Sequence, residues 1–175
     1  MKNPRRLSSL VQICALVLAT LTPVSAHANP RAGSTAPAAT FLGHGGSGSL
    51  TTYRGQKVML WLFSTWCPSC HAGLAALAQK QAALAAGRVH LIVLENYRNG
   101  GYSGPSMAKL INQYASAVQH ASNWTFGAAT RQLASIYNPK SYPDIYYLIG
   151  GNGKIERVGS APSASMQEII TFAQK

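Results

Sequence analysis

The stretch KVMLWLFSTWCPSCHAGLAAL, residues 57–77, joins an unbroken apolar run to a pair of cysteines and a segment rich in alanine and leucine. Residues 57–63 show no polar–apolar alternation, which predicts a strand buried on both faces. Leucines at helical spacing then predict a helix that ends at Gly87. A second apolar run, residues 89–94, completes a strand–helix–strand unit whose length fits a parallel crossover.

The rest of the chain predicts further helices and a β-hairpin around this unit. In chain order we expect a helix at 105–118, a short strand at 124–126, a short helix at 128–137, a strand at 145–149, its antiparallel partner at 154–158 and a closing helix that begins near Ser165. Ser165 and Glu168 have the spacing of a capping box at the start of that helix. This order predicts an α/β fold in which a mixed sheet has helices on both faces.

The first 28 residues have the pattern of a secretory signal peptide. A positively charged start precedes the apolar run 10–21, which is short for a membrane span, and Ala26-His27-Ala28 supplies a small–x–small cleavage pattern. We expect cleavage after Ala28 and a mature chain, residues 29–175, that forms one domain; an uncleaved membrane anchor is the alternative. The predicted location is the periplasm or the extracellular space.

The chain is basic mainly because it has few acids. It contains 15 Lys and Arg against 4 Asp and Glu, and 12 of the basic residues lie outside the leader. These are spread almost evenly, whereas a nucleic-acid site would need them clustered, so we expect no nucleic-acid partner. Carboxylates paired in the native state lose their contribution to stability in acid, so this composition favours an exported protein from an acid-living bacterium.

Only Cys67 and Cys70 remain after the leader is removed. A bridge between cysteines three positions apart adds little entropic stability, so we interpret the pair as a redox-active dithiol that needs no further cofactor. It lies where a strand gives way to a helix, and the amides of a helix N-terminus favour a thiolate. We expect the more exposed Cys67 to exchange with a substrate disulfide and the more buried Cys70 to resolve the mixed disulfide.

Two neighbours of the cysteines are candidates for tuning their reactivity. Ser69 is expected to donate a hydrogen bond toward the sulfurs, and a protonated His71 near the pair would stabilise a thiolate. Pro68 suits a first helical turn and is expected to contact the substrate. The same residues also spell Cys-x-x-Cys-His, the attachment motif for a c-type haem with His71 as iron ligand. That alternative does not require the apolar strand before the motif, whereas a dithiol at a strand–helix junction does. A zinc site would need two more ligands, and the histidines show no matching spacing.

At these residues the chain resembles the thioredoxin superfamily. The segment KVMLWLFSTWCPSCHAGLAAL is similar to its strand, W-C-x-x-C and helix, and the flanks resemble the exported TlpA/ResA-type (redoxin) branch. The similar flanks are GSTAPAATFLGHGGSGSLTTYRGQKVMLWLFS before the dithiol and SYPDIYYLIGGNGKIERVGSAP after it, so the resemblance covers about residues 33–175. It implies a thioredoxin-like fold with a short hairpin before the core strand.

The resemblance also implies roles for residues outside the dithiol. It implies a cis peptide bond between Tyr142 and Pro143 beside the cysteines, with the Tyr142 backbone free to pair with an extended substrate segment, and it places Trp66 over the site to contact partners. Many relatives carry a carboxylate near the buried cysteine, but the two usual positions hold Trp61 and Gly73 here. Glu95, at the end of the next strand, is the remaining candidate; a solvated Glu95 is the alternative we favour.

Together these observations predict an exported thiol–disulfide oxidoreductase that acts on protein thiols or disulfides, as a reductase in preference to an oxidase. A membrane thiol reductant or oxidant is the expected redox partner, and the chain is expected to be a monomer. A disulfide-donating oxidase, a c-type haem electron carrier and a thiol-dependent peroxidase are the alternatives.

Overall fold

The computed structural model describes residues 30–43 and 45–175, and the expected signal peptide lies outside them. The strands form one seven-stranded sheet in the order β2-β1-β5-β4-β3-β6-β7. Their bounds are β1 Thr40–Gly43, β2 Gly46–Ser49, β3 Lys57–Phe63, β4 Val89–Glu95, β5 Trp124–Ala129, β6 Asp144–Ile149 and β7 Ile155–Gly159. Strands β3, β4 and β5 are parallel, while β1, β2, β6 and β7 each pair antiparallel with their neighbours, so the predicted mixed sheet is confirmed.

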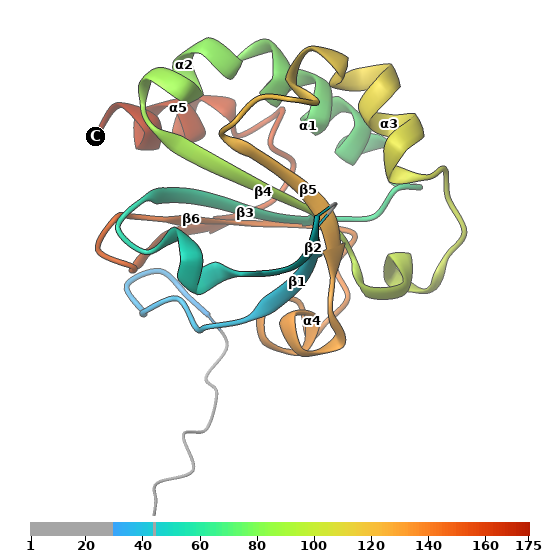
Figure 1. Cartoon of the computed structure of the whole chain (residues 1–175), viewed down its shortest axis with the longest axis horizontal. Helices are drawn as coiled ribbons and strands as arrows, with labels where there is room; N and C mark the ends of the chain where they lie inside the picture. Colours follow the sequence, from blue (N-terminus) through green and yellow to red (C-terminus); the bar gives the residue numbers. More distant parts are fainter. Residues whose placement is uncertain (1–29, 44) are drawn as a thin grey trace, which may run out of the picture.

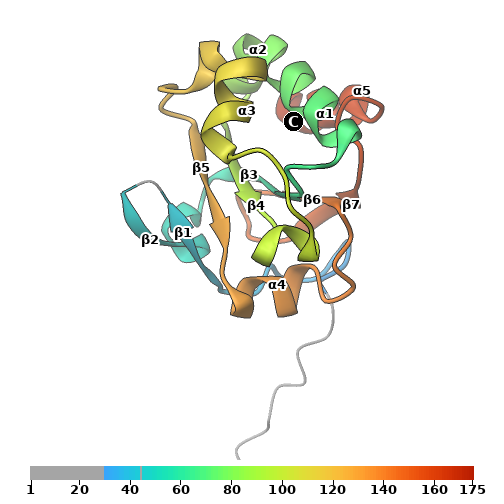
Figure 2. The ribbon, with the colours of Figure 1, turned by 90° about the vertical axis from the view of Figure 1, so that its right-hand side faces the viewer.

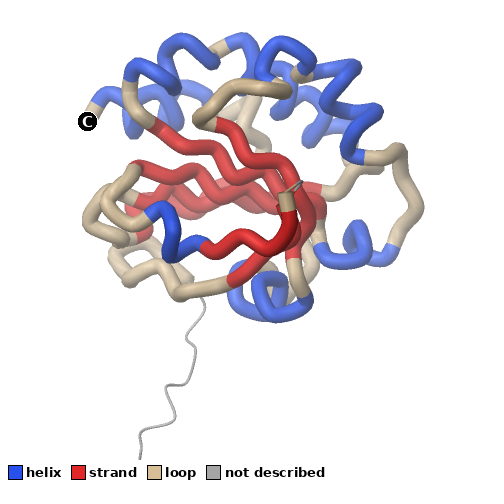
Figure 3. Tube along the Cα trace, viewed as in Figure 1, coloured by secondary structure: helices blue, strands red, loops and turns tan. Residues whose placement is uncertain are grey.

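Helices cover both faces of this sheet, as predicted. The α-helices are α1 Pro68–Gln79, α2 Gln81–Ala86, α3 Met107–Tyr114, α4 Arg131–Tyr137 and α5 Met166–Gln174. Figures 1 and 2 show α1, α2, α3 and α5 together on one face and α4 on the other. The tube in Figure 3 shows the strands as one layer between them. The arrangement is the α/β, thioredoxin-like fold that the sequence predicts.

The central strand β3 is buried on both faces because each face supports a separate part of the core. Trp61 and Phe63 join the cluster under α1, α3 and α5, whereas Leu60 and Leu62 join the cluster that contains residues of α4. All four side chains are fully buried. Burial of a large apolar side chain stabilises a fold by about 1.5–3 kcal/mol, so this strand is a rigid support for the segment that follows it.

Element boundaries differ from the predictions in three places. Strand β5 continues to Ala129 because it pairs with β1 as well as β4, and α4 therefore begins three residues later than expected. Pro105 precedes α3, which begins at Met107 with Ser106 as its N-cap. The helix after the dithiol is interrupted at Lys80 and continues as α2.

The described residues contain neither a candidate membrane span nor a candidate metal cluster. Within residues 30–43 and 45–175, none of the helices is long and apolar enough to cross a bilayer. In the same residues, no three His, Cys, Asp or Glu side chains gather closely enough to hold a metal ion.

Candidate active site

The dithiol lies where β3 ends and α1 begins. Cys67 is the N-cap of α1, with its side chain making no capping hydrogen bond, and Pro68 occupies the first turn. Both cysteines are free thiols; Cys67 is 5% exposed and Cys70 is fully buried. The structure therefore places the two sulfurs in the expected order, with the first at the helix start and the second one turn further in.

Ser69 and His71 differ in how they relate to the sulfurs. The Ser69 hydroxyl lies 3.1 Å from the Cys67 sulfur. The His71 ring lies against Thr65, with Nε2 2.7 Å from the carbonyl oxygen, and stacks on Tyr114 at 5.2 Å. Because the oxygen can only accept, Nε2 must carry the proton of this hydrogen bond. That nitrogen is thus hydrogen-bonded to the backbone in this structure.

Two acceptors lie near the Cys70 thiol: the Pro143 carbonyl oxygen, just before β6, and the carboxyl group of Asp144, the first residue of β6. The Cys70 sulfur donates to the Pro143 carbonyl oxygen at 3.3 Å, and the Asp144 carboxyl group interacts with the same thiol. Burial raises the pKa of the Cys70 thiol far above its ordinary value, and the neighbouring Cys67 and the Asp144 charge raise it further. The Cys70 thiol is therefore protonated at neutral pH, and it needs a proton acceptor before its sulfur can attack a disulfide.

Asp144 is held in place by two hydrogen bonds. The Trp61 indole donates to Oδ1 at 2.8 Å, and the Ala161 amide donates to Oδ2 at 3.0 Å. Burial raises the pKa of the Asp144 carboxyl, and hydrogen bonds to its ionised form only partly offset the effect. A buried carboxylate with a raised pKa accepts a proton more readily than a surface aspartate.

Trp61 explains why this carboxylate comes from β6. On β3 it pairs directly with Tyr146, so Asp144 is its diagonal neighbour on the same face. Its ring also fills the space next to Gly73, where an added Cβ would lie 3.1 Å from both Trp61 and Pro162. The two positions at which relatives carry a carboxylate are thus a bulky indole and a glycine beneath it, and the indole reaches across to hold Asp144.

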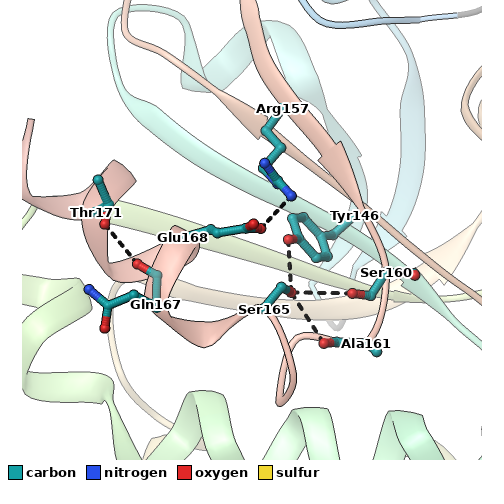
Figure 4. A network of polar contacts seen from close by, with 8 residues as sticks. All are labelled: Tyr146, Arg157, Ser160, Ala161, Ser165, Gln167, Glu168 and Thr171. Carbon is teal, nitrogen blue, oxygen red and sulfur yellow. Dashed lines mark hydrogen bonds and ion pairs between the residues drawn. The ribbon is translucent and has the colours of Figure 1, made fainter.

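A network at the start of α5 fixes the amide that donates to Asp144. Figure 4 shows Tyr146 directed at Ser165, with its hydroxyl 2.8 Å from the serine oxygen. Ser165 in turn lies 3.2 Å from the carbonyl oxygens of Ser160 and Ala161, and Ala161 adopts a left-handed φ of 46°. Ser165 is the N-cap, but its hydroxyl makes no capping bond, so the expected capping box is wrong. The hydroxyl instead stabilises the turn that carries the Ala161 amide.

The Tyr142–Pro143 segment departs from what the resemblance implies. The peptide bond is trans, since the described residues contain no cis peptide. The Tyr142 carbonyl accepts from the amides of Asn96 and Asn138 at 3.0 and 2.8 Å, and its N–H donates to Asn138 at 2.8 Å. These internal bonds satisfy the backbone of Tyr142 in the trans form. They also occupy the groups that were expected to pair with a substrate strand, so that expectation is wrong for this conformation.

Trp66 lies beside the dithiol and is attached to the loop after β4. Its indole donates to the Asn99 carbonyl at 2.9 Å, and the Asn99 side chain bonds both the amide and the hydroxyl of Thr65. Trp66 also meets the Tyr102 ring edge-on at 5.1 Å. The sequence placed Trp66 at the site, but it gave no sign that Asn99 would hold the loop here.

Glu95 is not the carboxylate that serves the cysteines. It ends β4, pairs with Phe63 and Ala128, and is half-buried, with a pKa raised by burial. The charge that acts on the Cys70 thiol is that of Asp144. Asp144 was not among the residues expected from the sequence, although it directly follows Pro143, which the resemblance already placed beside the dithiol; that adjacency was the available signal.

The fold and this site define the class: a thiol–disulfide oxidoreductase of the thioredoxin fold. The chain belongs to the AhpC/TSA family, whose model matches residues 32–157. Comparison with curated proteins gave no match.

Solved structures with the same fold are similar in shape but distant in sequence. A thiol:disulfide interchange protein of the thioredoxin family from Chlorobium tepidum matches with a TM-score of 0.60 and 18% identity, covering 85% of this chain and 99% of that one. A secreted Mycobacterium tuberculosis disulfide oxidoreductase homologous to E. coli DsbE gives 0.59 and 19%, covering 78% and 94%. The reduced 2-Cys peroxiredoxin of Plasmodium vivax gives 0.58 and 19%, covering 82% and 80%.

Proposed function

We propose that this protein reduces disulfide bonds in other proteins outside the cytoplasm, with Cys67 as the attacking sulfur and Cys70 as the resolving sulfur. The observation that carries the proposal is the buried Cys70 thiol, which faces the Asp144 carboxyl while Cys67 caps a helix start. The Cys67–Cys70 disulfide is the redox group, with no metal or organic cofactor. The protein acts as a periplasmic or extracellular monomer, after export by residues 1–28, and a membrane thiol reductant regenerates it.

The reaction has two steps. The Cys67 thiol loses its proton to solvent, and the thiolate attacks the substrate disulfide to form a mixed disulfide. The substrate sulfur leaves as a thiolate and takes up one proton from solvent. The Cys70 proton then passes to the Asp144 carboxylate, and the Cys70 sulfur attacks Cys67, which releases the second substrate thiol with that proton. The substrate gains two electrons and two protons, and the protein ends with a Cys67–Cys70 disulfide.

The surroundings of Cys70 favour a reductase over an oxidase. Strong disulfide donors are oxidising because their reduced form is stabilised. Here burial and a neighbouring carboxylate both disfavour a Cys70 thiolate, so the site does not stabilise charge on the buried sulfur of the dithiol. The solved structures named as a thiol:disulfide interchange protein and a secreted disulfide oxidoreductase support thiol–disulfide exchange on this fold, in either direction.

Reduction of insulin by dithiothreitol tests the proposal. We expect the wild-type protein, residues 29–175, to shorten the lag before the insulin chains precipitate. Cys67→Ser should remove the effect entirely, and Cys70→Ser should form a stable adduct at Cys67. A wild-type protein that leaves the lag unchanged would refute the proposal. A visible spectrum of the purified exported protein tests the haem alternative, which requires a haem absorption band.

A further inference from the structure

The exposed aromatic side chains of this protein gather around the dithiol. Four large apolar side chains are strongly exposed in the described residues: Leu42, Tyr97, Tyr102 and Tyr142, at 53, 37, 67 and 48%. Leu42 lies on the edge hairpin, whereas the three tyrosines come from the loop after β4 and the loop before β6. Exposed aromatic residues that cluster are typical of surfaces that bind partners.

Two sets of hydrogen bonds attach these loops to the active site. Asn99 binds Thr65, which lies two residues before Cys67, and this places the loop that carries Tyr97 and Tyr102. Asn96 donates to the Tyr142 carbonyl at 3.0 Å and so joins that loop to the other. We name Trp66, Tyr97, Tyr102 and Tyr142 the aromatic rim; Trp66 meets Tyr102 at 5.1 Å.

Two exposed cations lie on the loops that carry the rim. Arg98 is exposed and lies over the Tyr97 ring at 5.6 Å, and Lys140 is exposed two residues before Tyr142. In the described part of the chain, neither takes part in an ion pair. These two cations lie on the loops that Asn96 connects, at the end of the sheet where β3 leads into the dithiol.

Two of the four acids lie in ion pairs away from this region. Glu156 pairs with Lys175 at 2.8 Å and Glu168 with Arg157 at 2.6 Å, on β7 and α5. Asp144 is buried and hydrogen-bonded. Glu95, which ends β4 directly before the loop that carries Tyr97 and Arg98, is half-buried and belongs to neither ion pair of the described residues. A partner that approaches the rim meets exposed aromatic surface and two exposed cations, which favours an acidic chain.

We propose that the aromatic rim, with Arg98 and Lys140, docks an acidic, extended segment of the protein substrate next to its disulfide. This inference rests on the proposed function and names its substrate class. The tyrosines supply contact area to the segment, and the two cations attract the carboxylates that flank its cysteines. Reduction then follows the two steps described above for Cys67 and Cys70. The substrate disulfide takes up two electrons and two protons, and Cys67 and Cys70 form a disulfide.

Three synthetic peptides test the proposal directly. Each carries the same intramolecular disulfide loop, flanked by two aspartates, two serines or two lysines on either side. The reduced protein, residues 29–175, is mixed with each peptide, and peptide thiols are counted after acid quench. At low ionic strength we expect the aspartate peptide to react about tenfold faster than the lysine peptide, and the ratio to approach one at about 0.5 M salt, because electrostatic steering is screened.

Matched variants separate the rim from the overall positive charge. Arg98→Gln with Lys140→Gln should lower the aspartate-to-lysine rate ratio several-fold. Arg54→Gln with Lys154→Gln removes the same charge at the opposite end of the sheet and should leave the ratio within twofold of wild type. Tyr102→Ser should slow all three peptides, whereas Leu42→Ser, an exposed apolar residue on the edge hairpin, should not.

The outcomes distinguish this inference from the proposed function. Equal rates for the three peptides, or equal effects of the two double variants, would overturn the docking inference while leaving disulfide reduction intact. A wild-type protein that reduces none of the peptides would overturn both.

Discussion

Replacement of Asp144 by asparagine isolates the proton transfer that the site is built to perform. Asparagine has the same shape, and its oxygen can keep the 2.8 Å bond from the Trp61 indole. Its NH2 group replaces the oxygen that accepts from Ala161 at 3.0 Å, so one hydrogen bond is lost at a cost of about 1–2 kcal/mol. The fold should therefore survive, while the group beside Cys70 can no longer accept a proton.

The expected effect on the resolving step is large. A positioned general base contributes about 10²–10⁴ in rate. We expect D144N to slow the Cys70 attack by about 10²–10³, which corresponds to about 3–4 kcal/mol of activation free energy. Removal of the Asp144 charge also lowers the pKa of the Cys70 thiol, so part of the lost rate of the resolving step should be recovered at alkaline pH.

The assay is a single turnover of the reduced protein with saturating oxidised glutathione, in which the resolving step limits the rate. Acid quench and mass spectrometry separate the mixed disulfide at Cys67 from the closed Cys67–Cys70 disulfide. In the wild type the rate should fall as pH drops through the raised pKa of Asp144. In D144N that inflection should vanish, and the mixed disulfide should accumulate.

Glu95→Gln is the matched control, since it removes the other carboxylate whose pKa burial raises, at the end of the neighbouring strand. Its resolving rate and pH profile should remain those of the wild type. A D144N protein that resolves within threefold of the wild type, with the same pH profile, would refute the assignment of Asp144 as the proton acceptor.

Four further predictions follow from the same structure. Trp61→Phe removes the indole donor to Asp144, which should lower the free energy of unfolding by about 2–3 kcal/mol in urea titrations and move the pH inflection of the resolving step upward; an unmoved inflection would contradict this. Gly73→Ala should lower the free energy of unfolding in urea titrations by about 1–3 kcal/mol, because the added Cβ would crowd Trp61. A variant as stable as the wild type would show that the space beside Trp61 accommodates a methyl group. Burial lowers the pKa of His90 in the folded protein. The neutral His90 side chain therefore contributes to stability above pH 6.5, its ordinary pKa, and this contribution is lost as pH falls through the lower pKa of the folded state. The urea midpoint of His90→Gln should thus be less sensitive to acid than that of the wild type. Cys70→Ala should accumulate a mixed disulfide with a substrate protein, readable as a mass adduct, and an adduct-free protein would exclude exchange through Cys67.

The fold was predictable because its signals are local. The apolar run 57–63, the cysteines that follow and the second apolar run specify a strand–helix–strand unit without knowledge of distant contacts. The order in which Cys67 and Cys70 are buried followed from helix geometry alone, since the second lies one turn further in. These parts of the site could be placed by residue number before the structure was known.

The proton acceptor was not predictable in the same way because it depends on pairing between strands. Asp144 reaches the cysteines only through the register of β6 on β3, and it is kept there by an indole from β3 and an amide from the turn before α5. The sequence showed that Trp61 occupies a position where relatives carry a carboxylate. That Trp61 also holds a carboxylate from β6 could be seen only from the side-chain positions.

The segment before β6 shows the same limit. Sequence resemblance implied a cis bond and an open backbone at Tyr142. The structure has a trans bond and a backbone whose polar groups are satisfied by Asn96 and Asn138, both of them buried. Asn96 lies 46 residues from Tyr142 in the sequence and Asn138 four residues from it, and neither stands in a pattern that marks it as a partner of this peptide unit.

The reduction potential of the Cys67–Cys70 pair tests the central claim most directly. The protein, residues 29–175, is equilibrated in glutathione buffers, and the fraction of closed disulfide is measured by mass after acid quench. We expect a closed disulfide between these two cysteines, with a potential at or below about −250 mV, in the range of thiol reductants. A potential near about −120 mV, typical of a disulfide donor, or a pair that does not close at any glutathione ratio, would contradict it.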